Sequence, residues 1–281
     1  MTSTSAQLRH LIRLLDDDSP VVREAVRRQL ASMRSHLPEA VQQLEETLTD
    51  EQERLLWEIL APVCREELEH TWLAWRWISN PDAQLEQALA QISAFLSGWR
   101  CTKESLAERL DALAELAARN GAGQEPRGLA EFLFSSRRGE ARLTGNSRDY
   151  YASNNGNLIW VLEHGLGNPI SLCCIYILVG RRLGLRIEGC NFPGHFLARV
   201  RIDGKSWLVD CFNRGRFMLA EDVSKHHPAA NPAMEDVIDE PTAVEAIIAR
   251  VLRNLDDAFA REEKNTERQI VRGLMMKLLK E

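Results

Sequence analysis

The sequence lacks any apolar run approaching the roughly 20 residues that span a bilayer, and its first residues lack the basic start and apolar stretch of a signal peptide. It also lacks an excess of positive charge, because 35 Lys and Arg stand against 41 Asp and Glu, for a net charge of -6. This balance gives no electrostatic reason to expect nucleic acid or an anionic membrane as a partner. We therefore expect a soluble, cytoplasmic protein that binds neither nucleic acid nor a membrane.

The cysteines show no CxxC spacing and have no histidine at the distance that metal sites require. There are six of them: Cys64, Cys101, Cys173, Cys174, Cys190 and Cys211. They lie in apolar or strand-like segments, so most are expected to be small buried residues rather than disulfide or zinc partners. A metal site built from His195, His226 and His227 has no carboxylate or thiol spacing to support it. We expect no metal and no other cofactor.

The first 80 residues carry apolar side chains at three- and four-residue steps, the pattern of amphipathic helices. Ser19 and Pro20 fit the cap and first position of one helix, and Pro38 is expected to begin another. Pro62 is expected to interrupt the chain before a tryptophan-rich helix. The first two helices, separated by an acidic turn, resemble a HEAT-like pair, and an ordinary helical bundle is the alternative. The sequence predicts a helical N-terminal domain over residues 1–80.

Further helices follow Asn80-Pro81, but residues 135–157 are rich in Gly, Ser, Asn and Arg and show no apolar periodicity. A loop of this length inside a domain is usually packed or functional, so we expect it to lie over the site. Tyr150 and Tyr151 either pin it there or are ordinary anchoring aromatics. Residues 236–281 predict a C-terminal helical pair, which either packs on the main body or serves as a docking surface.

A buried helix followed by a β-hairpin is predicted between Asn168 and Phe212. Asn168-Pro169 fits the cap and first position of the helix, which ends near Gly184. Asp203-Gly204 separates two alternating runs, which is the strongest short-range signal for a hairpin. A two-residue loop then pairs Ile202 with Lys205, Val200 with Trp207, Ala198 with Val209 and Phe196 with Cys211. One face of this hairpin is apolar.

On the other face Leu197 stands opposite Asp210, so His195 is a diagonal neighbour of Asp210. Diagonal positions lie roughly 7–8 Å apart at the backbone, within reach of a hydrogen bond between imidazole and carboxylate. Such a bond selects the histidine tautomer and stabilises its charged form, as in nucleophilic triads. Pairs of this kind also satisfy each other in protein cores, so a structural role is the alternative.

The strings GNPISLCCIYILVGRRLGL, EGCNFPGHFLARV and WLVDCF resemble the transglutaminase-like core, specifically its bacterial SirB-type family, and RDYYASNNGNLIWVLE upstream is also similar. The resemblance covers residues 85–220, within a predicted domain at 81–235. It implies an α+β, papain-like fold, in which a buried helix packs on a small antiparallel sheet. In active relatives it implies a Cys-His-Asp triad that acts on amide bonds. His195 and Asp210 match the histidine and aspartate positions.

The cysteine position does not match, because Gly167-Asn168-Pro169 stands where active relatives have Gly-x-Cys. Cys173 lies one turn further along the same helical face, about 6 Å deeper. It is either a replacement nucleophile or a small packing residue. Cys174 points about 100° away from it. Ser171 is either a nucleophile or, as is common for hydroxyls at helix starts, a cap.

Two functions follow from these residues. The first is a catalytically degenerate module that binds a protein or peptide partner through its helical domain and the groove over His195. The second is a thiol amidase, protease or acyl-transferase that uses Cys173, His195 and Asp210. Pro169 favours the first function, because its ring offers no nucleophile.

Overall fold

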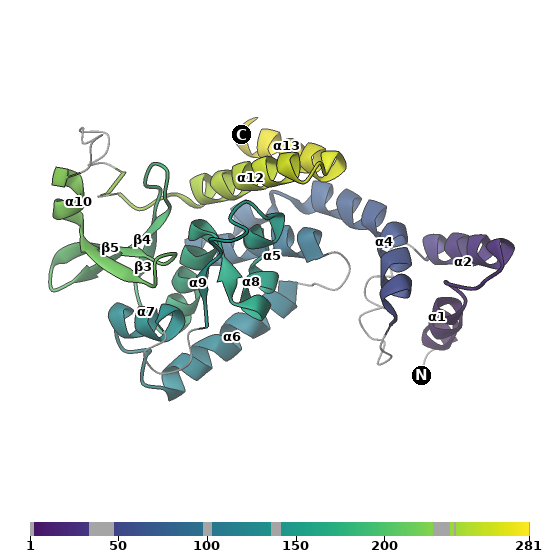
Figure 1. The fold of residues 1–281 in the computed structure, drawn as a ribbon, viewed down its shortest axis with the longest axis horizontal. Coiled ribbons are helices and arrows are strands. Elements are labelled where there is room, and N and C mark those ends of the chain that lie inside the picture. Colours follow the sequence, from purple (N-terminus) through teal and green to yellow (C-terminus); the bar gives the residue numbers. More distant parts are fainter. Residues whose placement is uncertain are drawn as a thin grey trace. The chain divides into compact units, whose positions relative to one another are not determined.

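The structure is a computed structural model that describes residues 3–33, 48–97, 103–135, 142–226, 237–238 and 240–280 (Figure 1). The chain divides into two compact units. The first comprises Met1–Trp72 with Ala94–Thr102, and the second comprises Leu73–Ser93 with Lys103–Glu281. The domain boundaries that we place at residues 80 and 235 stay predictions. No helix within the described ranges is long and apolar enough to cross a membrane.

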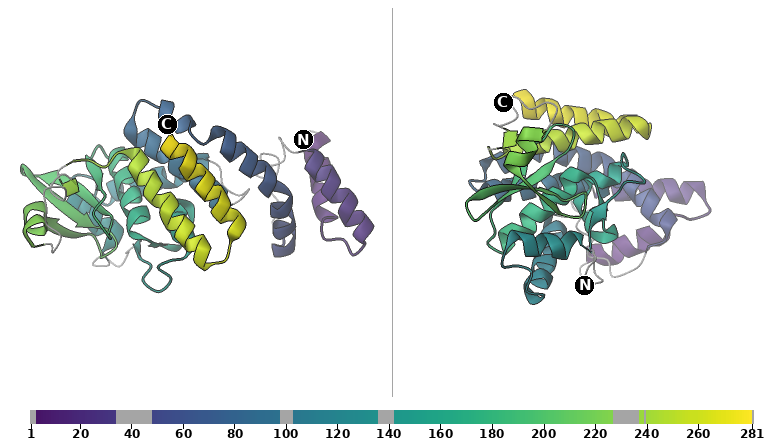
Figure 2. Two further views of the ribbon diagram at one scale, coloured as in Figure 1. Left: turned by 90° about the horizontal axis from the view of Figure 1, so that it is seen from above. Right: turned by 60° about the vertical axis from the view of Figure 1, so that its left-hand side comes forward.

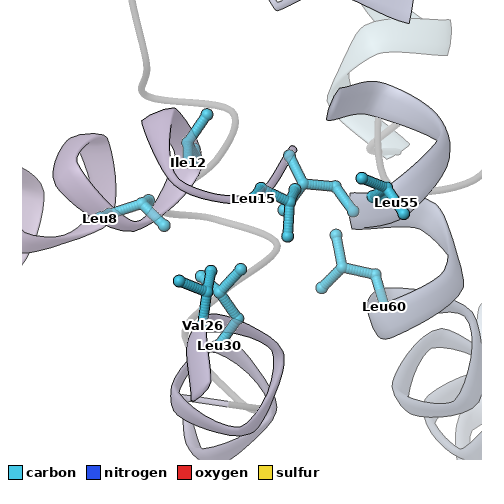
Figure 3. Close-up of a cluster of buried hydrophobic side chains, with 8 residues drawn as sticks. Leu8, Ile12, Leu15, Val26, Leu30, Leu55 and Leu60 are labelled. Atoms are coloured by element: carbon cyan, nitrogen blue, oxygen red, sulfur yellow. The ribbon is translucent and has the colours of Figure 1, made fainter. Parts of the chain in front are cut away.

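The first unit contains α1 (Ser3–Arg13), α2 (Pro20–Ser32) and α4 (Asp50–Thr71). Figure 3 shows apolar side chains from these helices and the turn after α1 pointing toward one another. The buried members are Leu8, Ile12, Leu15, Val26, Leu30, Leu55, Leu56 and Leu60. Burial of each such side chain contributes about 1.5–3 kcal/mol, so this cluster holds the unit together.

The expected interruption at Pro62 is wrong, because Pro62 lies inside helix α4 and the helix continues to Thr71. Thr49 and Gln52 form a capping box at its start, which satisfies backbone N–H groups there. Trp75 is buried in a 3-10 turn, η1 (Ala74–Trp77), rather than in a tryptophan-rich helix. The helix expected to begin at Pro38 lies outside the described residues.

In the second unit the helices gather around α9 (Pro169–Arg182), which is buried from Pro169 to Gly180. The other helices before it are α5 (Pro81–Ser97), which continues into the first unit, α6 (Lys103–Arg119), α7 (Pro126–Phe134) and α8 (Leu158–His164). Helices α6, α7 and α8 all contact α9. A helix that is apolar on every side requires such enclosure, which explains why α9 is central (Figure 1).

The sheet beside α9 is antiparallel, in the order β3-β4-β5-β6. Its strands are β3 (Ile187–Cys190), β4 (Leu197–Ile202), β5 (Lys205–Asp210) and β6 (Arg216–Leu219). Ile202 pairs with Lys205, Val200 with Trp207 and Ala198 with Val209. Asp203 and Gly204 have φ angles of 52° and 75°, as a type I′ turn requires. The predicted hairpin and its register are confirmed.

The sheet is covered on both faces. Helix α9 contacts β3 and β4. On the face that carries Leu197 and Leu208, a second apolar cluster includes Ala220 and Ile238. Ala220 begins α10 (Ala220–His226), a helix that, like strand β6, sequence reasoning missed. Arg199 is buried on this face and bonds Glu188, 2.5 Å away. The hairpin therefore has two buried faces rather than the single apolar face expected.

The C-terminal pair consists of α12 (Val244–Arg261) and α13 (Asn265–Lys280), which lie side by side in both views of Figure 2. Helix α12 contacts α9 and a short 3-10 turn, η4 (Ser153–Gly156). Its apolar stripe, which includes Ile248 and Leu252, is buried. Of the two roles left open, α12 therefore packs on the main body.

Candidate functional site

The hairpin brings His195 and Asp210 together. The Nε2 atom of His195 lies 2.8 Å from Oδ1 of Asp210. Gly194, with φ of 75°, forms the turn before β4, and the backbone N–H of His195 donates to the Phe192 carbonyl at 3.2 Å. The His195 side chain is 29% exposed and that of Asp210 11% exposed. The predicted hydrogen bond is therefore present, with its imidazole accessible from solvent.

Asn213 is a further partner of the carboxylate, and sequence reasoning missed it. Its backbone N–H donates to Oδ1 of Asp210 at 3.0 Å, and its side-chain amide donates to Oδ2 at 2.7 Å. Burial raises the pKa of Asp210, but the hydrogen bonds from His195 and Asn213 outweigh it and hold that pKa below its usual value. Asp210 is therefore an anion at neutral pH. The spacing of three residues between Asp210 and Asn213 could have indicated this contact, because an Asp side chain can accept from a backbone N–H a few residues along the chain.

Aromatic side chains pack beside the imidazole. The ring of His195 meets Phe212 edge-on at 6.1 Å between centroids, and Phe212 meets Tyr150 at 5.6 Å. Tyr151 packs against Tyr150 at 5.0 Å. A side chain on Gly145 would come within 2.7 Å of Phe212, so only glycine fits beside that ring. Tyr150 therefore pins its segment beside the site.

The segment that carries Tyr150 is held in place by hydrogen bonds of buried side-chain amides. It includes β1 (Thr144–Gly145), which pairs in parallel with β2 (Leu166–Gly167) immediately before α9. Asn155 is fully buried, accepts from Asn146 at 2.9 Å and donates to the Tyr150 carbonyl at 2.9 Å. Ser153 donates to the Glu262 carboxylate at the end of α12. The asparagine-rich composition thus supplies hydrogen bonds that regular backbone pairing would otherwise make.

Side chains at the start of α9 cap its backbone N–H groups. Asn168 accepts from the backbone N–H of Ser171 at 2.9 Å, and Ser171 Oγ accepts from the backbone N–H of Asn168 at 3.1 Å. Ser171 is 1% exposed. Its hydroxyl therefore caps the helix, as one of the two alternatives expected. Pro169 occupies the first helical position and is buried.

Cys173 is fully buried, and its thiol points to the Phe196 carbonyl, 3.6 Å from Sγ. Burial raises the pKa of this thiol well above its usual value, and neighbouring Cys211 and Asp210 raise it further. Burial likewise raises the pKa of Cys174. It raises that of Cys190 to about 12. The structure thus brings two of the three predicted triad residues together, while the Cys173 thiol bonds the sheet backbone.

The described residues contain no set of side chains suited to the metal site considered for His195, His226 and His227. No group of three or more His, Cys, Asp or Glu side chains there could hold an ion. His195 has its bond to Asp210, and His227 lies outside the described residues.

A family model described as the transglutaminase-like superfamily matches residues 104–253. A UPF0162 protein of *Xylella fastidiosa* (strain Temecula1) is 39% identical over 132 residues, which are 44% of this chain and 45% of that protein. A UPF0162 protein of *Vibrio cholerae* is 29% identical over 201 residues, 66% of this chain and 64% of that protein. Mouse F-box only protein 21 is 28% identical over 145 residues, 47% of this chain and 22% of that protein. No solved structure matches the chain.

The chain spans about half the length of the *Xylella* relatives. The SirB-type assignment stays a prediction. The family match covers more than half of the chain and contains α9, the four-stranded sheet and the first half of α12. It therefore includes Pro169, Cys173, His195 and Asp210. The chain belongs to the transglutaminase-like superfamily.

Proposed function

We propose that this chain is a catalytically inactive transglutaminase-like module that binds a peptide segment of a partner protein beside His195 and Asp210. One observation carries the proposal. The Cys173 thiol is fully buried and hydrogen-bonded to the Phe196 carbonyl, while Pro169 stands at the first position of the helix.

Thiol catalysis requires a thiolate, and reactive cysteines are partly exposed and have a lowered pKa. Cys173 has the opposite properties, because it is buried and its pKa is raised. Among the described cysteines only Cys64 is partly exposed, and it belongs to the first unit. These properties support a site that binds without forming a covalent intermediate.

The exposed groups of the site suit a peptide. The ring nitrogen of His195 that does not face Asp210 can exchange a hydrogen bond with an amide. Tyr150 and Tyr151 are 37% and 54% exposed, and aromatic residues of this kind are enriched at protein interfaces. The related segment of F-box only protein 21 occupies 22% of that protein. The related segment thus occurs as one part of a longer chain, which supports a modular role.

Iodoacetamide labelling of the native protein between pH 5 and 8, mapped by mass spectrometry, tests the proposal. We expect Cys173 to stay unmodified in native protein while the same cysteine is modified in denaturant. Cys64, which is partly exposed, serves as an internal reference for the reagent. Fast modification of Cys173 at low pH that disappears in His195→Ala would overturn the proposal in favour of the amidase or acyl-transferase.

A further inference from the structure

Arg250, on α12, is joined to the His195 turn through one shared acceptor. Its Nη1 donates to the Phe192 carbonyl at 2.9 Å, and the backbone N–H of His195 donates to the same oxygen at 3.2 Å. Nη1 also donates to Oδ1 of Asn191 at 2.5 Å. The Arg250 guanidinium lies 5.7 Å from the centre of the Phe196 ring. These contacts fix the guanidinium next to the imidazole-bearing turn.

Arg250 has no carboxylate partner among the residues that the structure describes. Its Nε and Nη2 atoms likewise make no hydrogen bond to a described residue. Burial and the charge of Arg253 lower the pKa of Arg250. Arg182, by contrast, bonds Glu86 and Asp111. A charged group that has lost part of its hydration is normally paired, whereas the acceptors of Arg250 among the described residues are both neutral.

The surroundings of Arg250 are positive and aromatic. Arg253, one turn further along α12, is exposed, and Arg261 stacks on the Tyr151 ring at 3.9 Å. Tyr150 is close enough to influence the pKa of Arg250. Three carboxylates lie on the same helix: Glu245 in its first turn, Asp256, which is bound by Arg268 and Arg272, and Asp257, which is exposed. None of these three forms an ion pair with Arg250.

We infer that Arg250 is an anion subsite of this face, and that the peptide bound beside His195 presents a carboxylate to the Nε and Nη2 atoms of Arg250. The inference rests on the proposed peptide-binding function. Guanidinium and carboxylate match as two parallel N–H to O hydrogen bonds, which gives both affinity and orientation. The carboxylate comes either from a peptide C-terminus or from an Asp or Glu side chain.

Three peptides separate these sources: N-acetyl-Ala-Ala-Ala with a free carboxylate, the same peptide as its amide, and N-acetyl-Ala-Glu-Ala-amide. Each is titrated into ¹⁵N-labelled protein, and the Arg250 Nε–H and His195 ring resonances are followed by NMR. We expect saturable shifts of both resonances with at least one carboxylate peptide. The neutral amide should bind at least about tenfold more weakly, because it lacks a charged acceptor.

Arg250→Gln should abolish the preference for carboxylate, and Arg250→Lys should keep part of it because a point charge remains. Arg253→Gln is the matched control, since it removes an equal charge one turn away and should weaken binding by less than about threefold. An unchanged His195 ring resonance in free Arg250→Gln shows that the turn is intact. Equal losses in Arg250→Gln and Arg253→Gln would overturn the subsite, because net charge would then explain them.

The outcomes separate this inference from the proposed function. Equal binding of all three peptides, with an inert Cys173, overturns the anion subsite and supports the proposed function. Absence of any binding overturns both the subsite and the peptide role. Carboxylate selection by Arg250 together with a His195-dependent, reactive Cys173 supports the subsite and overturns the inactive module.

Discussion

Asn213 holds Asp210 in place beside its contact with His195, because its two N–H groups bind the two carboxylate oxygens at 3.0 and 2.7 Å. The imidazole therefore meets a carboxylate whose rotation is already fixed. Burial alone would raise the pKa of Asp210, and these bonds together with that of His195 lower it. Asn213 is in this sense a positioning residue for the pair.

Asn213→Ala removes the side-chain donor and should raise the pKa of Asp210. Because a lowered pKa contributes stability above the unfolded pKa, the loss should reach about 1–2 kcal/mol at pH 7. It should shrink as pH falls through the pKa of folded Asp210. Urea unfolding at pH 7 and pH 3 measures this, with Asn213→Asp as the contrasting variant. A destabilisation by Asn213→Ala that is independent of pH would contradict the assigned role.

Pro169→Cys places a thiol at the position where the resemblance implies the nucleophile of active relatives. That thiol would lie at the N-terminus of α9, and the family resemblance implies that it faces His195; a helix N-terminus and an imidazolium both favour the thiolate. We expect alkylation by iodoacetamide at pH 6 that is at least about tenfold faster than that of fully buried Cys173, measured by mass spectrometry. The double variant Pro169→Cys with His195→Ala should lose most of this acceleration. Equal rates in the two variants would show that the imidazole does not face this position.

Gly145→Ala tests the contact between strand β1 and the Phe212 ring. The added methyl group would lie 2.7 Å from the Phe212 ring, so the ring, which also contacts His195, must shift. We expect a loss of about 1–3 kcal/mol in thermal unfolding and a changed His195 resonance. Gly273→Ala is the control, because no described atom lies within 4 Å of its added methyl group and the position is helical. That variant should be neutral or more stable by up to about 1 kcal/mol.

Cys173→Ala tests the packing role of the buried cysteine. If the thiol only fills space and donates to the Phe196 carbonyl, its removal should cost about 1–2 kcal/mol of stability. Peptide binding by the folded variant should stay unchanged in the NMR titration. Loss of binding with an unchanged unfolding midpoint would contradict a purely structural cysteine.

The hairpin could be predicted because its signals are local. Asp203-Gly204 sets the turn, and alternation sets the register, so the pairing of His195 with Asp210 follows from a 15-residue separation. Strand β6 and α10 follow Arg214 and Gly215, both with positive φ, and have no comparable periodic pattern. Their positions depend on covering the second face of the sheet.

Arg250 could not be predicted for a different reason. It lies 58 residues from Phe192, its acceptor, and appears in the sequence as one more charged residue on an amphipathic helix. Only the packing of α12 shows that it lies beside the His195 turn, with no carboxylate partner among the described residues. Pro62 illustrates the converse case, since a strong local signal for interruption is overridden within a long helix that packs its apolar face.

The capping box of α9 limits the backbone N–H donors that are available at the start of this helix. An acyl-transfer site needs donors for the oxyanion as well as a nucleophile. At this helix start Asn168 already accepts from the Ser171 N–H, and Pro169 has no N–H to offer. Replacing Pro169 with cysteine would supply a thiol and a backbone N–H at that position, while the Ser171 N–H would stay bound to Asn168. Under the proposed inactivity, a second donor would require a change at position 168 or 171 as well, so that catalysis would need more than one substitution.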